Sequence, residues 1–209
     1  FLQPRYSINN YISYVRTDNF SSNNSFRRTG GLSVNYNFSD RLSANGGGSV
    51  NFTKNNQTKY YSTARAKDAR SQQAFLGTSF LLTNNDIISG SLSYNYNKAR
   101  ERYNSFLGHS FQLSYARYLP FNQNLSLSFS RTANKYQKED PLIIETSCCV
   151  EYDKFIRKDF ISNIRMGFDG PLGESTWSYS LNTNWNSAES RIVNYTTSGQ
   201  TVGLSLTKD

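Results

Sequence analysis

Residues 32–38 read Leu32-Ser33-Val34-Asn35-Tyr36-Asn37-Phe38, and this stretch indicates the fold. Every second residue is apolar, and the residues between them are small and polar. Because a β-strand points successive side chains to opposite faces, such a strand has one apolar and one polar face. The same alternation returns in 88–96, 111–115, 125–129, 177–185 and 202–206. The sequence therefore predicts an all-β protein. Something other than water must cover the apolar face that its strands present.

The composition indicates what covers that face. Only 36% of the 209 residues are hydrophobic, and many of these are aromatic, with 15 Tyr and 14 Phe. A soluble sandwich would need a core rich in Val, Ile and Leu. An apolar face rich in aromatic residues, opposite a face of Ser, Asn, Gly and Thr, instead favours a barrel with lipid outside and a polar interior. No apolar run approaches the roughly 20 residues that a membrane-spanning helix needs.

Short turns and longer basic connections alternate along the chain. The short turns are expected at 39–40, 83–86, 120–124 and 170–175, and the longer connections at 17–28, 55–70, 98–105, 137–157 and 188–198. In outer-membrane barrels the short turns are periplasmic and the longer loops lie outside. Strands are predicted at 5–16, 29–38, 41–54, 71–82, 86–97, 106–119, 124–136, 158–169, 175–187 and 199–209.

We therefore expect an antiparallel up-and-down transmembrane β-barrel of about ten strands, located in the bacterial outer membrane. Residues 1–209 would form one barrel domain, either complete or the C-terminal part of a longer protein. An even number of strands would place both termini on the periplasmic side. The triplet Gly46-Gly47-Gly48 interrupts the third strand, and glycine there predicts a bend, a bulge or a contact with something in the lumen.

The polar parity of these strands predicts the lining of the lumen. Its residues are small and neutral apart from one arginine: Ser33, Asn35, Ser43, Asn45, Ser49, Asn51, Ser91, Ser93, Asn95, Ser126, Ser128, Arg165, Ser178, Ser180 and Asn182. Small inward side chains leave room for water, a plug or a passenger, whereas large ones would close a narrow barrel.

The net charge of +8 raises the question of which negatively charged partner the protein meets. Nucleic acid is one candidate, but no recognition helix or nucleic-acid motif accompanies the basic residues. We favour basic outer loops that meet the phosphates of lipopolysaccharide and other outer-membrane lipid. The loop residues expected to do so are Lys59, Arg65, Lys67, Arg70, Arg100, Arg102, Lys135 and Lys138.

Enzymatic chemistry finds little support in the sequence. A ten-stranded outer-membrane protease needs a histidine with carboxylate partners at the outer rim. The single histidine, His109, falls on the lipid-facing parity, although the carboxylates Glu101, Glu139, Asp140 and Glu145 could lie nearby. The adjacent Cys148 and Cys149 offer no metal-ligand spacing. We expect no catalytic site, no metal and no cofactor.

Two stretches carry a resemblance to known proteins. The hairpin GESTWSYSLNTNWNSAESRIVNYTTSGQTVGLSLTKD, which ends at residue 209, resembles the C-terminal hairpin of bacterial outer-membrane barrels. The stretch NYNFSDRLSANGGGSVNF at 35–52 is similar to the barrel portion of proteins that join a periplasmic tetratricopeptide module to an export barrel. These include surface-lipoprotein assembly modifiers and polysaccharide exporters. The resemblance implies a periplasmic module or partner subunit.

The first functional hypothesis is a polar-lined channel or export conduit for a hydrophilic passenger. The second is a non-conducting anchor or adhesin that displays basic surface loops, and the third is a soluble all-β binding domain. Conductance separates the first two hypotheses, and the need for detergent separates both from the third.

Overall fold

The computed structural model describes residues 6–17, 25–55, 68–138, 156–173, 176–190 and 196–208. These residues form ten strands: β1 (Tyr6–Thr17), β2 (Ser25–Asn37), β3 (Leu42–Asn55), β4 (Ala69–Thr83), β5 (Asp86–Ala99), β6 (Phe106–Leu119), β7 (Gln123–Tyr136), β8 (Lys158–Pro171), β9 (Trp177–Ser190) and β10 (Thr197–Lys208). Short 3-10 turns occur at Arg102–Asn104 and Pro120–Asn122. In the described ranges, no helix has the length and apolar character needed to cross a membrane.

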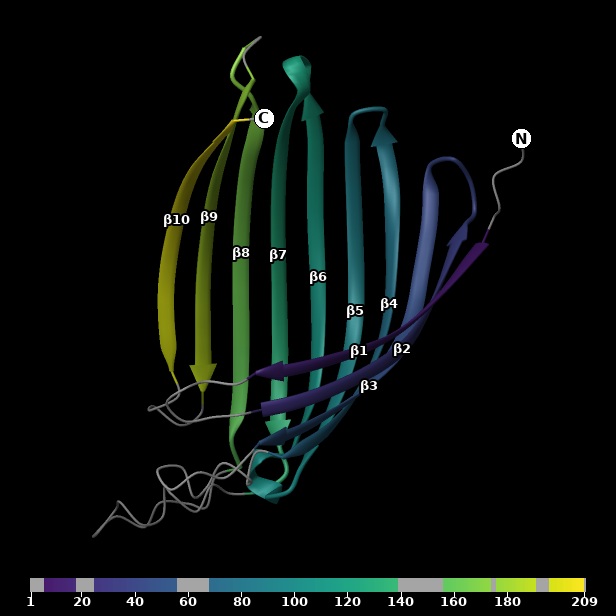
Figure 1. The fold of residues 1–209 in the computed structure, drawn as a ribbon, viewed down its shortest axis with the longest axis vertical. Helices are drawn as coiled ribbons and strands as arrows, with labels where there is room; N and C mark the ends of the chain where they lie inside the picture. The colour runs from purple at the N-terminus through teal and green to yellow at the C-terminus, as the bar shows by residue number, and fades with distance from the viewer. Residues whose placement is uncertain are drawn as a thin grey trace.

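The strands form one antiparallel sheet in the order β1 to β10, each paired with the next along the chain. Figure 1 shows a single curved layer. The short turns between β2 and β3, β4 and β5, and β6 and β7 lie at one end, the turn end (Figure 1). We call the opposite end the loop end. Strand β1 therefore starts and β10 finishes at the turn end. Within the described residues β1 pairs only with β2 and β10 only with β9, so both sheet edges are open.

The prediction of an all-β fold with ten antiparallel up-and-down strands is confirmed. The connection expected over 98–105 begins two residues later, at 100. Strand β5 continues to Ala99, and the hydroxyl of the buried Ser105 accepts the N–H of Ala99 at 2.9 Å, which closes a tight corner before β6. Strand β2 also begins at Ser25 rather than at 29, because its pairing with β3 extends to Ser25. Most of the expected connection over 137–157 lies outside the described residues.

The pairing register sorts the side chains into two faces. Leu76 lies opposite Leu92, and Leu92 opposite Phe111, on what we call the outer face. One residue along, Ser93 lies opposite Ser110 on the inner face. The Leu92 side chain is 64% exposed, whereas Ser93 is half-buried. Because crowding is greater on the hollow side of a curved sheet, this difference places the polar residues on the concave side.

The sheet has no conventional core. Among the apolar residues of the described part, only Ala99 is buried. Large apolar side chains of the outer face stay open to the surroundings, as Leu204 does at 70% exposure. Exposed apolar patches of more than a few hundred Å² mark sites that contact a membrane or another protein. The outer face thus has no protein layer against it in the described structure.

The glycine triplet in β3 lies in regular pairing, not in a bulge. Gly46, Gly47 and Gly48 keep an unbroken register with both β2 and β4. A Cβ on Gly47 would collide with the carbonyl oxygen of Leu32, and the ring of Phe75 would lie 3.0 Å from it. Glycine is needed here because a neighbouring strand and an aromatic ring approach the backbone on the inner face.

Candidate functional site: the inner face of the sheet

All fifteen residues expected to line a lumen lie on the inner face of the sheet. The pairing Ser33–Gly47 and Asn35–Asn45 places the residues of β2 and β3 on one side, and Ser128–Arg165 and Arg165–Asn184 do the same for β7 to β9. Strands β2 and β3 thus contribute polar side chains to the same face as β7, β8 and β9, although they are far apart in the sheet. That this surface encloses water remains a prediction.

Part of the polar surface is hydrogen-bonded across neighbouring strands. The hydroxyl of Ser71 donates to Oδ1 of Asn97 at 2.7 Å, and the Ser93 and Ser110 hydroxyls lie 2.5 Å apart. A second serine pair, Ser89 and Ser114, has its oxygens 2.7 Å apart. These contacts satisfy side-chain polar groups within the wall and hold them close to the backbone. Short, tethered serine and asparagine side chains thus make up much of the wall, and the larger Tyr11 and Phe75 on the same face lie against glycines of neighbouring strands.

Charge is scarce on the inner face. Among the described strands it carries Arg27, Asp159, Arg165 and Asp169. Arg27, Asp159 and Asp169 lie within three residues of a strand end, whereas Arg165 lies in the middle of β8. Arg165 is exposed and has no hydrogen bond or ion pair to any residue in the described part of the chain. It is thus a lone cation in the middle of an otherwise neutral surface.

Amide groups lie next to Arg165. Asn184 of β9 lies directly opposite it, and Asn186 lies two residues further along the same face. The Oδ1 atoms of both asparagines are buried without a hydrogen-bond partner among the described residues. Buried polar atoms normally have a partner, which includes ordered water. The exposed Arg165 guanidinium can donate hydrogen bonds to a hydrophilic molecule, whereas these two Oδ1 atoms lie within the wall.

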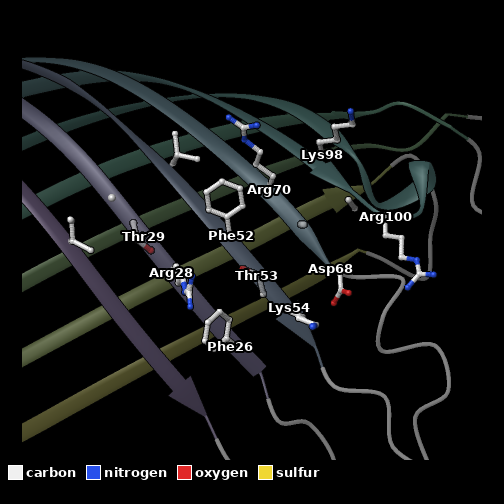
Figure 2. A pocket seen from close by; sticks show the side chains of 15 residues that line it. Phe26, Arg28, Thr29, Phe52, Thr53, Lys54, Asp68, Arg70, Lys98 and Arg100 are labelled. Carbon is white, nitrogen blue, oxygen red and sulfur yellow. The ribbon is translucent and has the colours of Figure 1, made fainter.

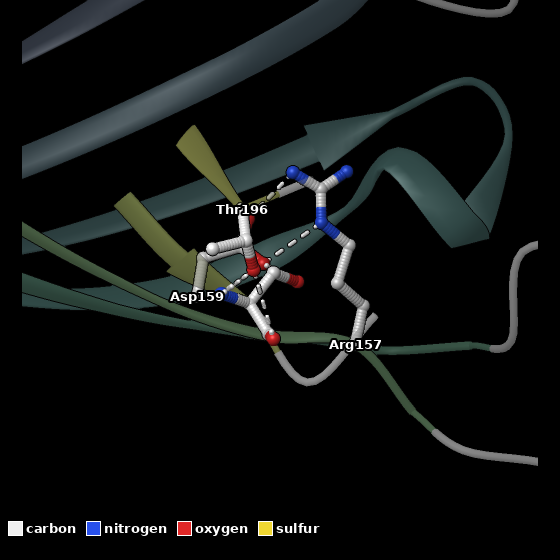
Figure 3. Close-up of polar contacts among 4 residues, drawn as sticks. Arg157, Asp159 and Thr196 are labelled. Carbon is white, nitrogen blue, oxygen red and sulfur yellow. Dashed lines mark hydrogen bonds and ion pairs between the residues drawn. The ribbon is translucent and has the colours of Figure 1, made fainter. Parts of the chain in front are cut away.

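A polar cluster at the loop end joins β8, β9 and the start of β10 (Figure 3). The Arg157 guanidinium contacts Asp159 through two nitrogen atoms, with Nε donating to Oδ1 at 2.9 Å. The Ser190 hydroxyl donates to the same Oδ1 at 2.7 Å, and the N–H of Ser190 donates to Oγ1 of Thr196 at 3.2 Å. Arg157 also lies over the ring of Tyr136, 4.5 Å from its centroid.

The sequence did not reveal this cluster. The only local signal is that Arg157 and Asp159 are two residues apart and so share a face. Ser190 and Thr196 come from distant parts of the chain, and only the pairing of β8 with β9 brings Ser190 opposite Asp159. We interpret the cluster as a structural clasp that fixes the rim of the sheet.

The basic residues predicted for the outer loops divide into three groups. Arg100, Arg102 and Lys138 lie in connections at the loop end. Arg70 and Lys135 do not lie in loops: they belong to β4 and β7, on the outer face, because these strands extend past their apolar part. Lys59, Arg65 and Lys67 fall outside the described residues.

The single histidine lies on the outer face, as its parity predicted. His109 is opposite Tyr94, and the two rings meet edge to face with centroids 5.3 Å apart. Of the four carboxylates expected near it, Glu139, Asp140 and Glu145 lie outside the described residues, as do Cys148 and Cys149. Within the described part, no group of three His, Cys, Asp or Glu side chains is placed to hold a metal ion. The expectation that the chain is not an enzyme stays a prediction.

No protein-family model matches the sequence, and no curated protein matches it. Among solved structures, the chain is similar to a mutant of the ferric enterobactin receptor of Pseudomonas aeruginosa, with 12% sequence identity and a TM-score of 0.49. The matched part covers 88% of this chain and 31% of the receptor chain, so the chain spans about a third of the receptor's length. The resemblance to tetratricopeptide-linked export barrels remains an expectation.

Proposed function

We propose that this sheet is the wall of a bacterial outer-membrane β-barrel whose outer face contacts lipid and whose inner face lines a conduit for a hydrophilic passenger. The observation that carries the proposal is the constancy of the two faces. From Leu76 on β4 through Leu92 and Phe111 to Ile164 on β8, the outer face presents apolar residues mid-strand. The inner face over the same strands is mostly polar, with Ser91, Ser93 and Ser128 among its residues and Phe75 and Ile87 as apolar exceptions.

Contact with water would be unfavourable for the large apolar side chains of the outer face. A soluble domain of this size would bury its large apolar side chains, whereas Leu76, Leu92 and Leu204 are at least 60% exposed on one side of the sheet. Burial of apolar surface contributes roughly 25 cal/mol for each Å². The hydrocarbon of a bilayer supplies that burial without a second protein layer. This argument disfavours the soluble binding domain.

A membrane also imposes a condition on the open edges. In hydrocarbon every backbone N–H and C=O must be hydrogen-bonded within the protein, and a closed barrel is the only sheet that achieves this. Strand β1 runs from the turn end to the loop end, and β10 runs the opposite way. Both strands also point their apolar side chains to the outer face, as Ile8 on β1 and Leu204 on β10 show. We propose that β1 and β10 pair antiparallel and close the barrel.

The inner face then suits passage rather than chemistry. Tethered serine and asparagine side chains leave space along the axis, and the exposed Arg165 offers hydrogen-bond donors midway. Such a lumen lowers the free-energy cost of moving a polar molecule through the membrane. The alternative, a non-conducting anchor that displays its basic loop end, has the same wall but a blocked lumen.

Planar-bilayer recording tests the proposal. The chain, refolded in detergent, is expected to migrate faster on a gel before heating than after heating, as a closed barrel does, and to give discrete conductance steps. Replacement of Ser93 and Ser128 by Phe should lower the step size while the gel shift stays. A folded barrel without conductance, even with a periplasmic partner present, would favour the anchoring function. A chain without the gel shift would contradict the barrel itself.

A further inference from the structure

A row of basic and aromatic residues crosses the outer face near the loop end. In the pairing register Arg28 of β2 lies opposite Phe52 of β3, Phe52 lies opposite Arg70 of β4, and Arg70 lies opposite Lys98 of β5. One step toward the loop end, Phe26 lies opposite Lys54. Figure 2 shows Arg28, Phe52, Arg70 and Lys98 across these neighbouring strands.

These side chains form the edge of an open groove of about 910 Å³. Its lining includes five cations (Arg28, Lys54, Arg70, Lys98 and Arg100) and one carboxylate, Asp68. All five cations are exposed. In the part of the chain that the structure describes, none of the five has a carboxylate within ion-pair distance. The groove therefore concentrates positive charge that the described residues leave uncompensated.

The floor of the groove is apolar. Ile12 and Val50 line it, one step toward the middle of the sheet from Arg28 and Phe52. The Arg28 guanidinium lies over the Phe26 ring at 4.9 Å, and that of Arg70 over the Phe52 ring at 5.4 Å from its centroid. Aromatic rings attract cations and also pack against hydrocarbon. The groove thus has a charged edge at the loop end that continues into an apolar surface.

The turn end of the same strands has a different character. There the outer face of β3 and β4 carries Leu42 and Phe80, and Arg41 lies in the turn between β2 and β3. On the neighbouring strands β5 and β6, the Arg117 Nε lies 3.7 Å from Asp86 Oδ1, so these two charges compensate each other. Across β2 to β5, the cations on the outer face of the described strands (Arg28, Lys54, Arg70 and Lys98) therefore all lie in this groove.

From this arrangement we propose that the groove binds the phosphate groups of a glycolipid in the leaflet at the loop end, such as lipopolysaccharide. Arg28, Arg70 and Lys98 contact the phosphates, and acyl chains lie along Val50 and Ile12. Three strand spacings separate Arg28 from Lys98, a span of roughly 14 Å, which suits a head group with two phosphates. The inference rests on the proposed barrel and names a lipid partner for its outer face.

Lipid binding by the chain refolded in detergent micelles tests the inference. Native mass spectrometry would compare diphosphorylated lipid A, the same lipid with its phosphates removed, and inorganic phosphate alone. We expect the diphosphorylated lipid to stay bound and the dephosphorylated lipid to bind at least tenfold more weakly, because charge-assisted contacts to phosphate are lost. Equal binding of the two lipids, or displacement of lipid by an equal concentration of inorganic phosphate, would overturn the inference.

Two matched double variants locate the site. Arg28→Gln with Arg70→Gln removes two charges from the groove, and Arg102→Gln with Lys138→Gln removes two from the loop end outside it. The proposed groove thus replaces the sequence-based expectation that Arg102 and Lys138 contact the phosphates. The groove variant should lose about tenfold in affinity or more, whereas the control should change less than about twofold, as expected for screened surface charges. An equal loss in both would indicate attraction by net charge alone and would overturn the inference.

The gel shift separates this inference from the barrel proposal. A chain that shows the shift yet binds all lipids alike contradicts the lipid site and leaves the barrel intact. A chain that shows no shift contradicts the barrel and, with it, a lipid-facing groove. A third variant, Arg28→Lys with Arg70→Lys, keeps both charges and is expected to retain most of the binding. Loss as large as in the Gln variant would contradict a phosphate contact made through charge.

Discussion

Arg157 and Asp159 form a two-point ion pair on the inner face at the loop end, with one guanidinium nitrogen 2.6 Å from Oδ2 and Nε 2.9 Å from Oδ1. The Asp159 residue is only 6% exposed. Its carboxylate also accepts the hydroxyl of Ser190, so one acidic group joins β8 to β9. The pair therefore holds the rim of the sheet at a point where no apolar core does so.

The Asp159→Asn variant should destabilise the rim. The amide keeps the shape but loses the negative charge, and charge-assisted hydrogen bonds contribute roughly 1.5–3 kcal/mol each. Urea unfolding in micelles should show a loss of about this size. Asp169→Asn is the control, because Asp169 lies on the same face of β8 and accepts only a long 3.5 Å bond from Asn124. A comparable loss in both variants would contradict a special role for the clasp.

Leu92 and Ser93 test the assignment of the two faces. Leu92→Arg places a charge mid-strand on the outer face and should cost roughly 2–4 kcal/mol if that position meets the middle of the bilayer. Ser93→Arg places the same side chain on the inner face, where it loses the contact with Ser110 and should cost about 1 kcal/mol. Folding titrations into lipid vesicles would measure both. Equal costs would contradict the lipid-facing assignment.

Labelling in intact cells tests the orientation of the barrel. With Cys148 and Cys149 first replaced by Ser, single Arg102→Cys and Lys138→Cys variants should react with a membrane-impermeant reagent. Asp40→Cys and Asn85→Cys lie at the turn end and should react only after the outer membrane is opened. The reason is that short turns of outer-membrane barrels face the periplasm. The opposite pattern would invert the orientation.

Arg165 should set the charge preference of the lumen. Arg165→Glu changes a lone cation into an anion midway along the inner face, so the reversal potential in a salt gradient should move toward cation preference. The shift should shrink between about 0.1 M and 1 M salt as the Debye length falls from about 10 Å to 3 Å. Arg131→Glu makes the same charge change on the outer face and should leave the potential in place. A shift of the same size there would place the ion path elsewhere.

Cysteine cross-linking tests closure of the sheet. An Asn9→Cys substitution on β1, combined in turn with Thr201→Cys, Gly203→Cys and Ser205→Cys on β10, should give one disulfide-linked pair, because paired strands bring Cα atoms within disulfide reach. Ser180→Cys with Ser205→Cys is the positive control, since these residues are opposite in the β9–β10 register. A control that cross-links while every β1–β10 pair fails would contradict direct pairing of β1 with β10.

The local features of the fold could be read from the sequence. Alternation places Leu92 and Ser93 on opposite faces whatever their neighbours are, because successive side chains of a strand point in opposite directions. The same reasoning found all ten strands and put Arg165 on the polar side. It misjudged the start of β4 at Arg70, because the strand continues into basic sequence once a neighbouring strand supplies hydrogen bonds. It also assigned Lys135 to an outer loop, although the predicted strand over 124–136 already contained that residue.

What only the tertiary structure decided is which residues become neighbours. The row from Arg28 through Phe52 and Arg70 to Lys98 joins four strands, and no spacing in the sequence predicts it. The contact of Ser190 with Asp159 likewise depends on the register of β8 with β9. The physical reason is that side-chain alternation is a property of a single strand, whereas register is set by backbone pairing between segments far apart in the chain.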